Sequence, residues 1–143
     1  MTLPPIRDLL PHAGAMVLVD EILEATQDRI VSRVTLRPTS PFLEEGRVPA
    51  IVGIEYMAQT IAAYAGLRAR AAGQAPRIGF LLGTREMNLE VDAFAVGDEL
   101  TVEAQHVWGD NLIGSFRCEV RRGTRPLVSA LVNVYQGDEV PDP

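Results

Sequence analysis

The sequence contains no lysine, so all 13 of its strongly basic side chains are arginines. Aspartate and glutamate outnumber them at 19, and the net charge at pH 7 is −6. Non-specific binding to nucleic acid depends on a basic surface patch, so this balance argues against nucleic acid as a partner. The single cysteine, Cys118, excludes an intrachain disulfide. The only histidines, His12 and His106, are far apart and show no metal-ligand spacing, so we expect no metal site.

The N-terminus also lacks the apolar run of a signal peptide, which favours a cytoplasmic protein. One long apolar stretch does occur, from Val48 to Leu67, but it contains Glu55, Gln59 and many alanines. A membrane span needs about 20 predominantly apolar residues. We therefore expect no transmembrane helix.

The chain has 143 residues with 47% hydrophobic content, values typical of one globular domain. No linker, repeat or low-complexity tract divides it, so a single domain over 1–143 is expected. Its acidic, proline-bearing end, 136–143, is interpreted as a frayed tail.

The Val48–Leu67 stretch predicts one long central helix over about 48–70. Its apolar residues recur at steps of three and four, and Pro49 suits a first helical turn. The face so defined comprises Ile51, Ile54, Ala58, Ile61, Ala62 and Ala65. We expect this helix to be buried on nearly all sides. A carboxylate in such a place, Glu55, then faces a ligand cavity, caps backbone N–H groups, or pairs with an arginine.

Strand patterns flank the helix on both sides. Two are expected before it, at 16–23 and 28–37, followed by a loop over 38–47. Four more are expected after it, at 78–91, 98–107, 112–120 and 127–135, several with clear alternation of apolar and polar residues. His106 shares the apolar face of the second of these four and is interpreted as a core residue. This order predicts an α+β fold in which a curved antiparallel sheet wraps around the helix, the hotdog arrangement.

Four segments, in order, resemble a known family. They read LLPHAGAMVLVDEI, SPFLEEG, PAIVGIEYMAQ and VDAFAVGDELTVEAQ. Together they resemble the hotdog-fold 3-hydroxyacyl-acyl-carrier-protein dehydratases (FabA/FabZ-like), and especially a divergent branch found near aryl-polyene biosynthetic genes. The resemblance covers about 10–136. It implies an acyl carrier protein with a phosphopantetheine thioester as partner, a homodimer or higher oligomer of dimers, and no cofactor.

The resemblance also implies roles for individual residues. Glu55 matches the helix acid that does proton work in dehydration. Gln59 matches a glutamine one turn later that helps position the substrate. Ala50 takes the place of the glycine whose N–H holds the thioester oxygen, and its neighbour Ile51 is expected on the substrate as well.

The sequence departs from the family just before the helix. There it reads Gly46-Arg47-Val48-Pro49-Ala50, about six residues shorter than the family's loop, and Arg47 stands where the family has its histidine. Arginine stays protonated and is not a general base. We expect Arg47 either to pair with Glu55 or to bind a phosphopantetheine phosphate. His12, in the LPH motif, then forms the best catalytic pair with Glu55.

Three functions follow as alternatives. The first is a 3-hydroxyacyl-thioester dehydratase in fatty acid or polyene-type biosynthesis. The second is a catalytically impaired subunit that binds acyl carrier protein or completes a heterodimer. The third is a hotdog acyl thioesterase, in which the carboxylate activates water.

Overall fold

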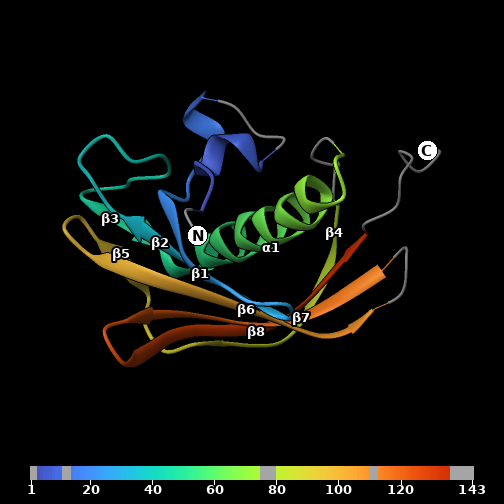
Figure 1. The fold of residues 1–143 in the computed structure, drawn as a ribbon. Coiled ribbons are helices and arrows are strands. Elements are labelled where there is room, and N and C mark those ends of the chain that lie inside the picture. The colour runs from blue at the N-terminus through green and yellow to red at the C-terminus, as the bar shows by residue number, and fades with distance from the viewer. Residues whose placement is uncertain (1–2, 11–13, 75–79, 110–112, 136–143) are drawn as a thin grey trace, which may run out of the picture.

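The computed structural model describes residues 3–10, 14–74, 80–109 and 113–135. Six strands form one antiparallel sheet in the order β1-β2-β6-β7-β8-β4. Their bounds are β1 (Glu21–Ala25), β2 (Arg29–Thr35), β4 (Phe80–Leu89), β6 (Glu99–Gly109), β7 (Ile113–Arg122) and β8 (Arg125–Tyr135). The sheet curves around one α-helix, α1 (Gly53–Ala71) (Figure 1). The architecture predicted from the sequence is therefore confirmed. None of the described helices is long and apolar enough to span a membrane.

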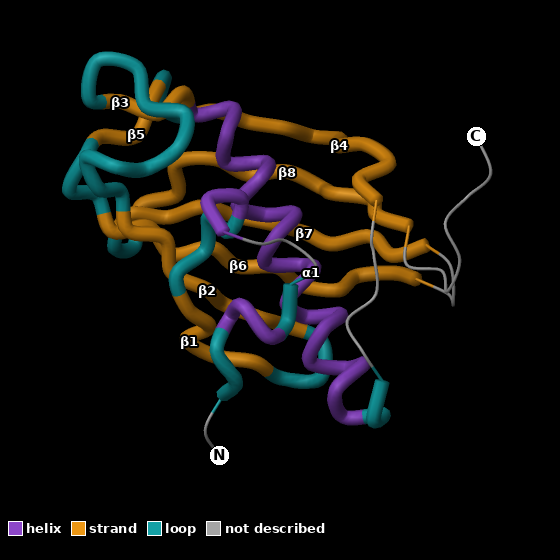
Figure 2. The backbone as a smooth tube through the Cα atoms, turned by 90° about the horizontal axis from the view of Figure 1, so that it is seen from above, coloured by secondary structure: helices purple, strands orange, loops and turns teal. Residues whose placement is uncertain are grey.

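The central helix begins as a 3₁₀ turn, η3 (Ala50–Val52), and continues as α1. Pro49 precedes it at the N-cap, close to the predicted start. Figure 2 shows α1 crossing the sheet diagonally, from the side of β8 and β4 toward the side of β1. A Cβ added at its first residue, Gly53, would lie 3.5–3.6 Å from the side chains of Phe94, Val120 and Val128. The first turn is thus held against the end of the sheet.

The expectation that α1 is buried on nearly all sides was wrong. The helix faces the sheet with a different set of residues, which includes Tyr56, Met57, Thr60, Ala63 and Tyr64. The face predicted from the periodicity is mostly the open one: Ile51 is 51% exposed and Ile54, Ala58, Ala62 and Ala65 are only half-buried, whereas Ile61 is buried. Both faces are apolar, so the hydrophobic period alone did not distinguish them.

The sheet's contribution to the core follows the predicted alternation. Every second residue of the long strands is buried beneath α1. These residues are Leu100, Val102 and Ala104 on β6, Phe116, Cys118 and Val120 on β7, and Val128, Ala130 and Val132 on β8. Because strand side chains alternate between faces, a period of two in the sequence was sufficient to predict them.

The N-terminal segment covers a third side of α1, which faces neither the sheet nor the open surface. It contains two 3₁₀ turns, η1 (Ile6–Asp8) and η2 (Gly14–Met16). Its approach to the helix is close: a Cβ on Gly66 would lie 2.3 Å from the carbonyl oxygen of Leu9. The strand predicted over 16–23 is wrong in its first half, because β1 begins only at Glu21. Backbone groups of Met16 and Leu18 bond to a side chain of α1 instead of to a neighbouring strand.

A second, two-stranded sheet was not predicted. It pairs β3 (Arg47–Pro49) with β5 (Ala93–Ala95), with Val48 opposite Phe94. At three residues each, these strands are too short to show an alternation in the sequence. They anchor the chain immediately before η3 and so fix where the central helix begins. The tail predicted at 136–143 lies outside the described residues.

Candidate functional site

Glu55 lies in the first turn of α1 and is exposed. Among the described residues it makes no hydrogen bond to the helix backbone and no ion pair with an arginine. Two of the three interpretations of this carboxylate, as a cap and as a partner of arginine, are therefore not supported by the described contacts. Glu55 is thus free to contact a molecule that approaches from outside the chain.

The backbone N–H groups before Glu55 differ in their availability. Ala50, the position matched to the family's donor, is 1% exposed, and its N–H already donates to the carbonyl oxygen of Asp92 at 2.9 Å. The next N–H, that of Ile51, has no backbone partner within the described ranges. Ile51 is also 51% exposed. The available donor at the start of the helix is therefore Ile51, one turn before Glu55.

Arg47 begins β3, just before the helix, and is exposed. Its backbone forms a two-way bridge with Glu44, at 2.7 and 3.1 Å, which closes a tight turn through Glu45 and Gly46. Both turn residues have positive φ, 52° and 76°. Within the described part of the chain the Arg47 side chain makes no ion pair with Glu55. Its guanidinium remains available for an anionic ligand.

Gln59 lies one turn after Glu55, but it is 1% exposed and fully engaged. Its Oε1 accepts a hydrogen bond from the Leu18 N–H at 2.8 Å, and its Nε2 donates to the Met16 carbonyl at 2.6 Å. The expected direct contact with substrate is not supported by this geometry. Gln59 instead ties the N-terminal segment to the helix beside the site.

The structure describes one of the two histidines and not the other. His12, the expected partner of Glu55, lies outside the described residues, so its role stays a prediction. His106 packs with its ring centroid 5.1 Å from that of Phe116 and 6.3 Å from that of Tyr64. It belongs to the aromatic packing under the far end of α1, as its position on the β6 face predicted.

One edge of the sheet is formed by β4, on the side from which α1 starts (Figure 2). β4 is the last strand in the order and pairs only with β8. It carries three largely exposed leucines, Leu81, Leu82 and Leu89, at 44%, 55% and 47%. Open strand edges with exposed apolar side chains are normally covered by another chain. The exposed leucines thus form an apolar surface along the β4 edge.

Sequence reasoning missed two features of this region. The Asp92 carbonyl occupies the Ala50 N–H, and a backbone carbonyl has no residue-type signature that could have revealed it. Tyr56 was the other: it lines a cavity on the side of α1 away from the Glu55 surface, beside the N-terminal segment. An aromatic residue inside an apolar run gave no signal beyond packing.

An antiparallel sheet wrapped around a central helix defines a hotdog-fold protein, and the match to a dehydratase family gives its class. Residues 4–142 match the ApeP-like family, described as ApeP dehydratase, and the chain belongs to that family. A solved chain from the dehydratase heterocomplex ApeI:P of Xenorhabdus doucetiae is 30% identical with a TM-score of 0.92. The match covers 96% of this chain and 94% of that one.

Two curated relatives are also dehydratases. The 3-hydroxyacyl-acyl-carrier-protein dehydratase FabZ of Streptococcus agalactiae is 30% identical over 135 residues, 90% of this chain and 84% of the relative. FabZ of Streptococcus equi subsp. zooepidemicus is 31% identical over 140 residues, 94% and 88% of the two chains. A hypothetical thioesterase of Streptococcus pneumoniae shares the fold at a TM-score of 0.61, with 17% identity and coverage of 84% and 88%. That likeness concerns the fold alone.

Proposed function

We propose that this chain is a subunit of a 3-hydroxyacyl-thioester dehydratase that acts on acyl groups carried by acyl carrier protein. The reaction removes a proton from C2 and the hydroxyl from C3, and releases water and a 2-enoyl thioester. The observation that carries the proposal is Glu55 on the first turn of α1, which is exposed and has no partner among the described residues. It fits a carboxyl group that gives its proton to the leaving hydroxyl.

The Ile51 N–H supports the same chemistry. Negative charge develops on the thioester oxygen as the C2 proton leaves, and a preorganised N–H donor at a helix N-terminus stabilises that charge. In the proposed complex the thioester oxygen lies on the Ile51 N–H, because the Ala50 N–H is already bonded to Asp92. His12 takes the C2 proton, and Arg47 binds the phosphate of the phosphopantetheine arm. Arginine suits phosphate because its planar fork donates two parallel hydrogen bonds.

A partner subunit completes the site. In a single chain Glu55 is exposed to solvent, and water would compete for the same hydrogen bonds. A second subunit added at the β4 edge would cover the exposed leucines and bring its own surface against the open face of α1. Either a second copy or a related dehydratase chain satisfies this requirement.

A second candidate function follows from one observation. Arg47 stands where the resemblance places a histidine, and arginine is not a general base. On this alternative the chain binds acyl carrier protein and supports an active partner without doing the proton transfer itself. The similarity to a chain from a dehydratase heterocomplex favours keeping it.

One experiment separates these functions. The purified chain is incubated with a 3-hydroxyacyl-acyl-carrier-protein, alone and with a candidate partner dehydratase chain, and the carrier is analysed by intact mass. Loss of one water from the chain alone supports the dehydratase. Loss of water only in the mixture, together with a stable complex, supports the partner-subunit function. Release of a free carrier thiol would overturn both in favour of a thioesterase.

A further inference from the structure

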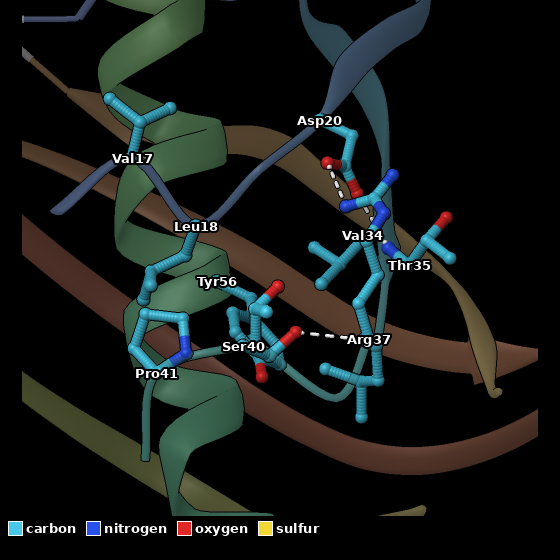
Figure 3. A pocket seen from close by; sticks show the side chains of 11 residues that line it. Val17, Leu18, Asp20, Val34, Thr35, Arg37, Ser40, Pro41 and Tyr56 are labelled. Carbon is cyan, nitrogen blue, oxygen red and sulfur yellow. Dashed lines mark hydrogen bonds and ion pairs between the residues drawn. The ribbon is translucent and has the colours of Figure 1, made fainter. Parts of the chain in front are cut away.

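A cavity of about 170 Å³ lies between α1, β2 and the N-terminal segment. Val17 and Leu18 line it from the N-terminal segment, Val34 lines it from β2, and Ser40 and Pro41 line it from the loop that follows β2 (Figure 3). Tyr56 supplies the contribution of the helix. Glu55 is not among the lining residues, so this cavity is separate from the surface proposed for the reaction.

Tyr56 brings an unused hydrogen-bonding group to this cavity. The residue is 2% exposed, and within the described ranges its hydroxyl has no hydrogen-bond partner. Among buried side-chain atoms there, only the Nε of Arg33 is both unpaired and completely enclosed, so the Tyr56 hydroxyl retains access to the cavity. Tyr64, two turns further along α1, shows the usual arrangement of a buried tyrosine, in which the hydroxyl has a partner. Its hydroxyl donates to the Gln27 carbonyl at 2.7 Å.

The charged groups of the lining are already satisfied by one another. One oxygen of Asp20 accepts a hydrogen bond from the Arg37 side chain at 2.9 Å, and the other accepts one from the Thr35 N–H at 2.6 Å. The dashed lines in Figure 3 follow these contacts. Burial raises the pKa of Tyr56 to about 12, so its hydroxyl stays protonated and donates at neutral pH. The cavity therefore offers a neutral donor, a lining in which polar groups expose more surface than apolar ones, and no unpaired charge.

The volume limits what fits. An apolar cavity of about 150 Å³ holds one benzene molecule. The space here thus suits a single six-membered ring or a branched group of similar size. A charged ligand would lose its hydration without finding a counter-ion.

We propose that this cavity is a second ligand site, which takes a small, neutral, polar molecule whose carbonyl or hydroxyl oxygen accepts a hydrogen bond from Tyr56. The site does not depend on the reaction at Glu55. Binding there requires no turnover and no partner subunit.

The test uses cyclohexanone as the probe, titrated into the ¹⁵N-labelled chain and followed by amide chemical shifts. Saturable shifts are expected at residues that line the cavity, among them Val17 and Leu18, and not around Ile51. The variant Tyr56→Phe removes only the hydroxyl and should bind about five- to tenfold more weakly. Its matched control, Tyr64→Phe, loses a hydroxyl outside the cavity and should bind as the wild type does.

Two further measurements keep the test decisive. Tyr56→Phe should keep the wild-type melting temperature or exceed it, because the hydroxyl that it removes is unpaired. Leu18→Phe adds bulk to the cavity wall and should abolish the shifts. Equal affinity of the wild type and Tyr56→Phe, unaltered binding by Leu18→Phe, or no saturable shift at the cavity would overturn the proposal.

Discussion

Glu55 and Tyr56 follow one another on the first turn of α1, yet they meet different surroundings. Glu55 is exposed and unpaired among the described residues, whereas Tyr56 is 2% exposed and lines a cavity. Successive residues of a helix project about 100° apart, which is enough to send one toward the open face and the other inward. A single helical turn thus serves two surfaces, one for the proposed reaction and one for the proposed second ligand.

The contact between Gly66 and Leu9 makes a direct stability prediction. In Gly66→Ala the new Cβ would lie 2.3 Å from a backbone oxygen, so the N-terminal segment must move. Alanine gains about 1 kcal/mol over glycine as a helix former, but overpacking is unfavourable by about 1–3 kcal/mol. We expect a net loss of about 1–2 kcal/mol in the free energy of unfolding, measured by urea denaturation. Gly53→Ala, whose Cβ has contacts of 3.5 Å or more, is the control and should be neutral or stabilising.

Gln59 is predicted to act as an anchor and not as a substrate contact. Gln59→Leu keeps the volume but removes both hydrogen bonds to the N-terminal segment. The Leu18 amide should then exchange with deuterium at least about tenfold faster, since each lost bond contributes about 1 kcal/mol. Amides within β7 should keep their protection. An unchanged Leu18 amide would mean that the segment is held by other contacts.

The charge cluster on the outer face of the sheet predicts a dependence of stability on pH. Burial on its own raises the pKa of Glu103, but hydrogen bonds from Arg121 and Arg29 outweigh it, and the net pKa lies below the ordinary value. A lowered pKa in the folded state stabilises the protein above the unfolded pKa, about 4.3, and this contribution is lost as the pH falls further.

The variant Glu103→Gln should therefore lower the free energy of unfolding by about 1 kcal/mol at pH 7, and by less below about pH 4. Glu86→Gln is the control, because Glu86 is 64% exposed and its ion pair with Arg117 is long, at 3.5 Å. It should change stability by less than about 0.5 kcal/mol at any pH. A difference between wild type and Glu103→Gln that grows toward low pH has the wrong sign for this account.

The open edge of the sheet predicts the place of subunit contact. Leu82 is 55% exposed on β4, and Leu82→Arg puts a charge where a partner chain would be buried. We expect the dissociation constant of the dimer, measured by sedimentation, to rise at least about tenfold. Val107→Arg, on the inner strand β6 and 50% exposed, should leave the dimer intact. A wild-type chain that sediments as a monomer at all concentrations, and in mixtures with related chains, would contradict this.

Much of the fold could be predicted from periodicity, because apolar and polar residues alternate strictly in strands such as β6. This alternation identifies the buried residues directly. The orientation of α1 could not be predicted in this way, since Ile51, Ala58 and Ala62 on its open face are as apolar as Met57 and Ala63 on its buried face. Which face packs on the sheet is decided by size: Tyr56 and Tyr64 fill the curve of the sheet, whereas the alanine-rich face is left for close approach by another chain.

The sequence singles out a candidate site residue only where a side chain marks it. Glu55 stands out as a carboxylate in an apolar run, and its role in the reaction stays a prediction. The availability of N–H groups depends on backbone partners, so the exchange of Ala50 for Ile51 as donor needed the structure. Gln59 looked like a substrate contact because its partners, Met16 and Leu18, bond to it through backbone atoms 43 and 41 residues away.

The central claim is that the Glu55 carboxyl group transfers a proton in the dehydration of a 3-hydroxyacyl thioester. The most direct measurement is the rate of water loss from 3-hydroxyacyl-acyl-carrier-protein, by intact mass, for Glu55→Gln in whichever assembly is active. We expect kcat to fall at least about 100-fold, the usual contribution of a general acid or base, with carrier binding retained and with Glu90→Gln as active as the wild type. Full activity of Glu55→Gln would contradict the claim.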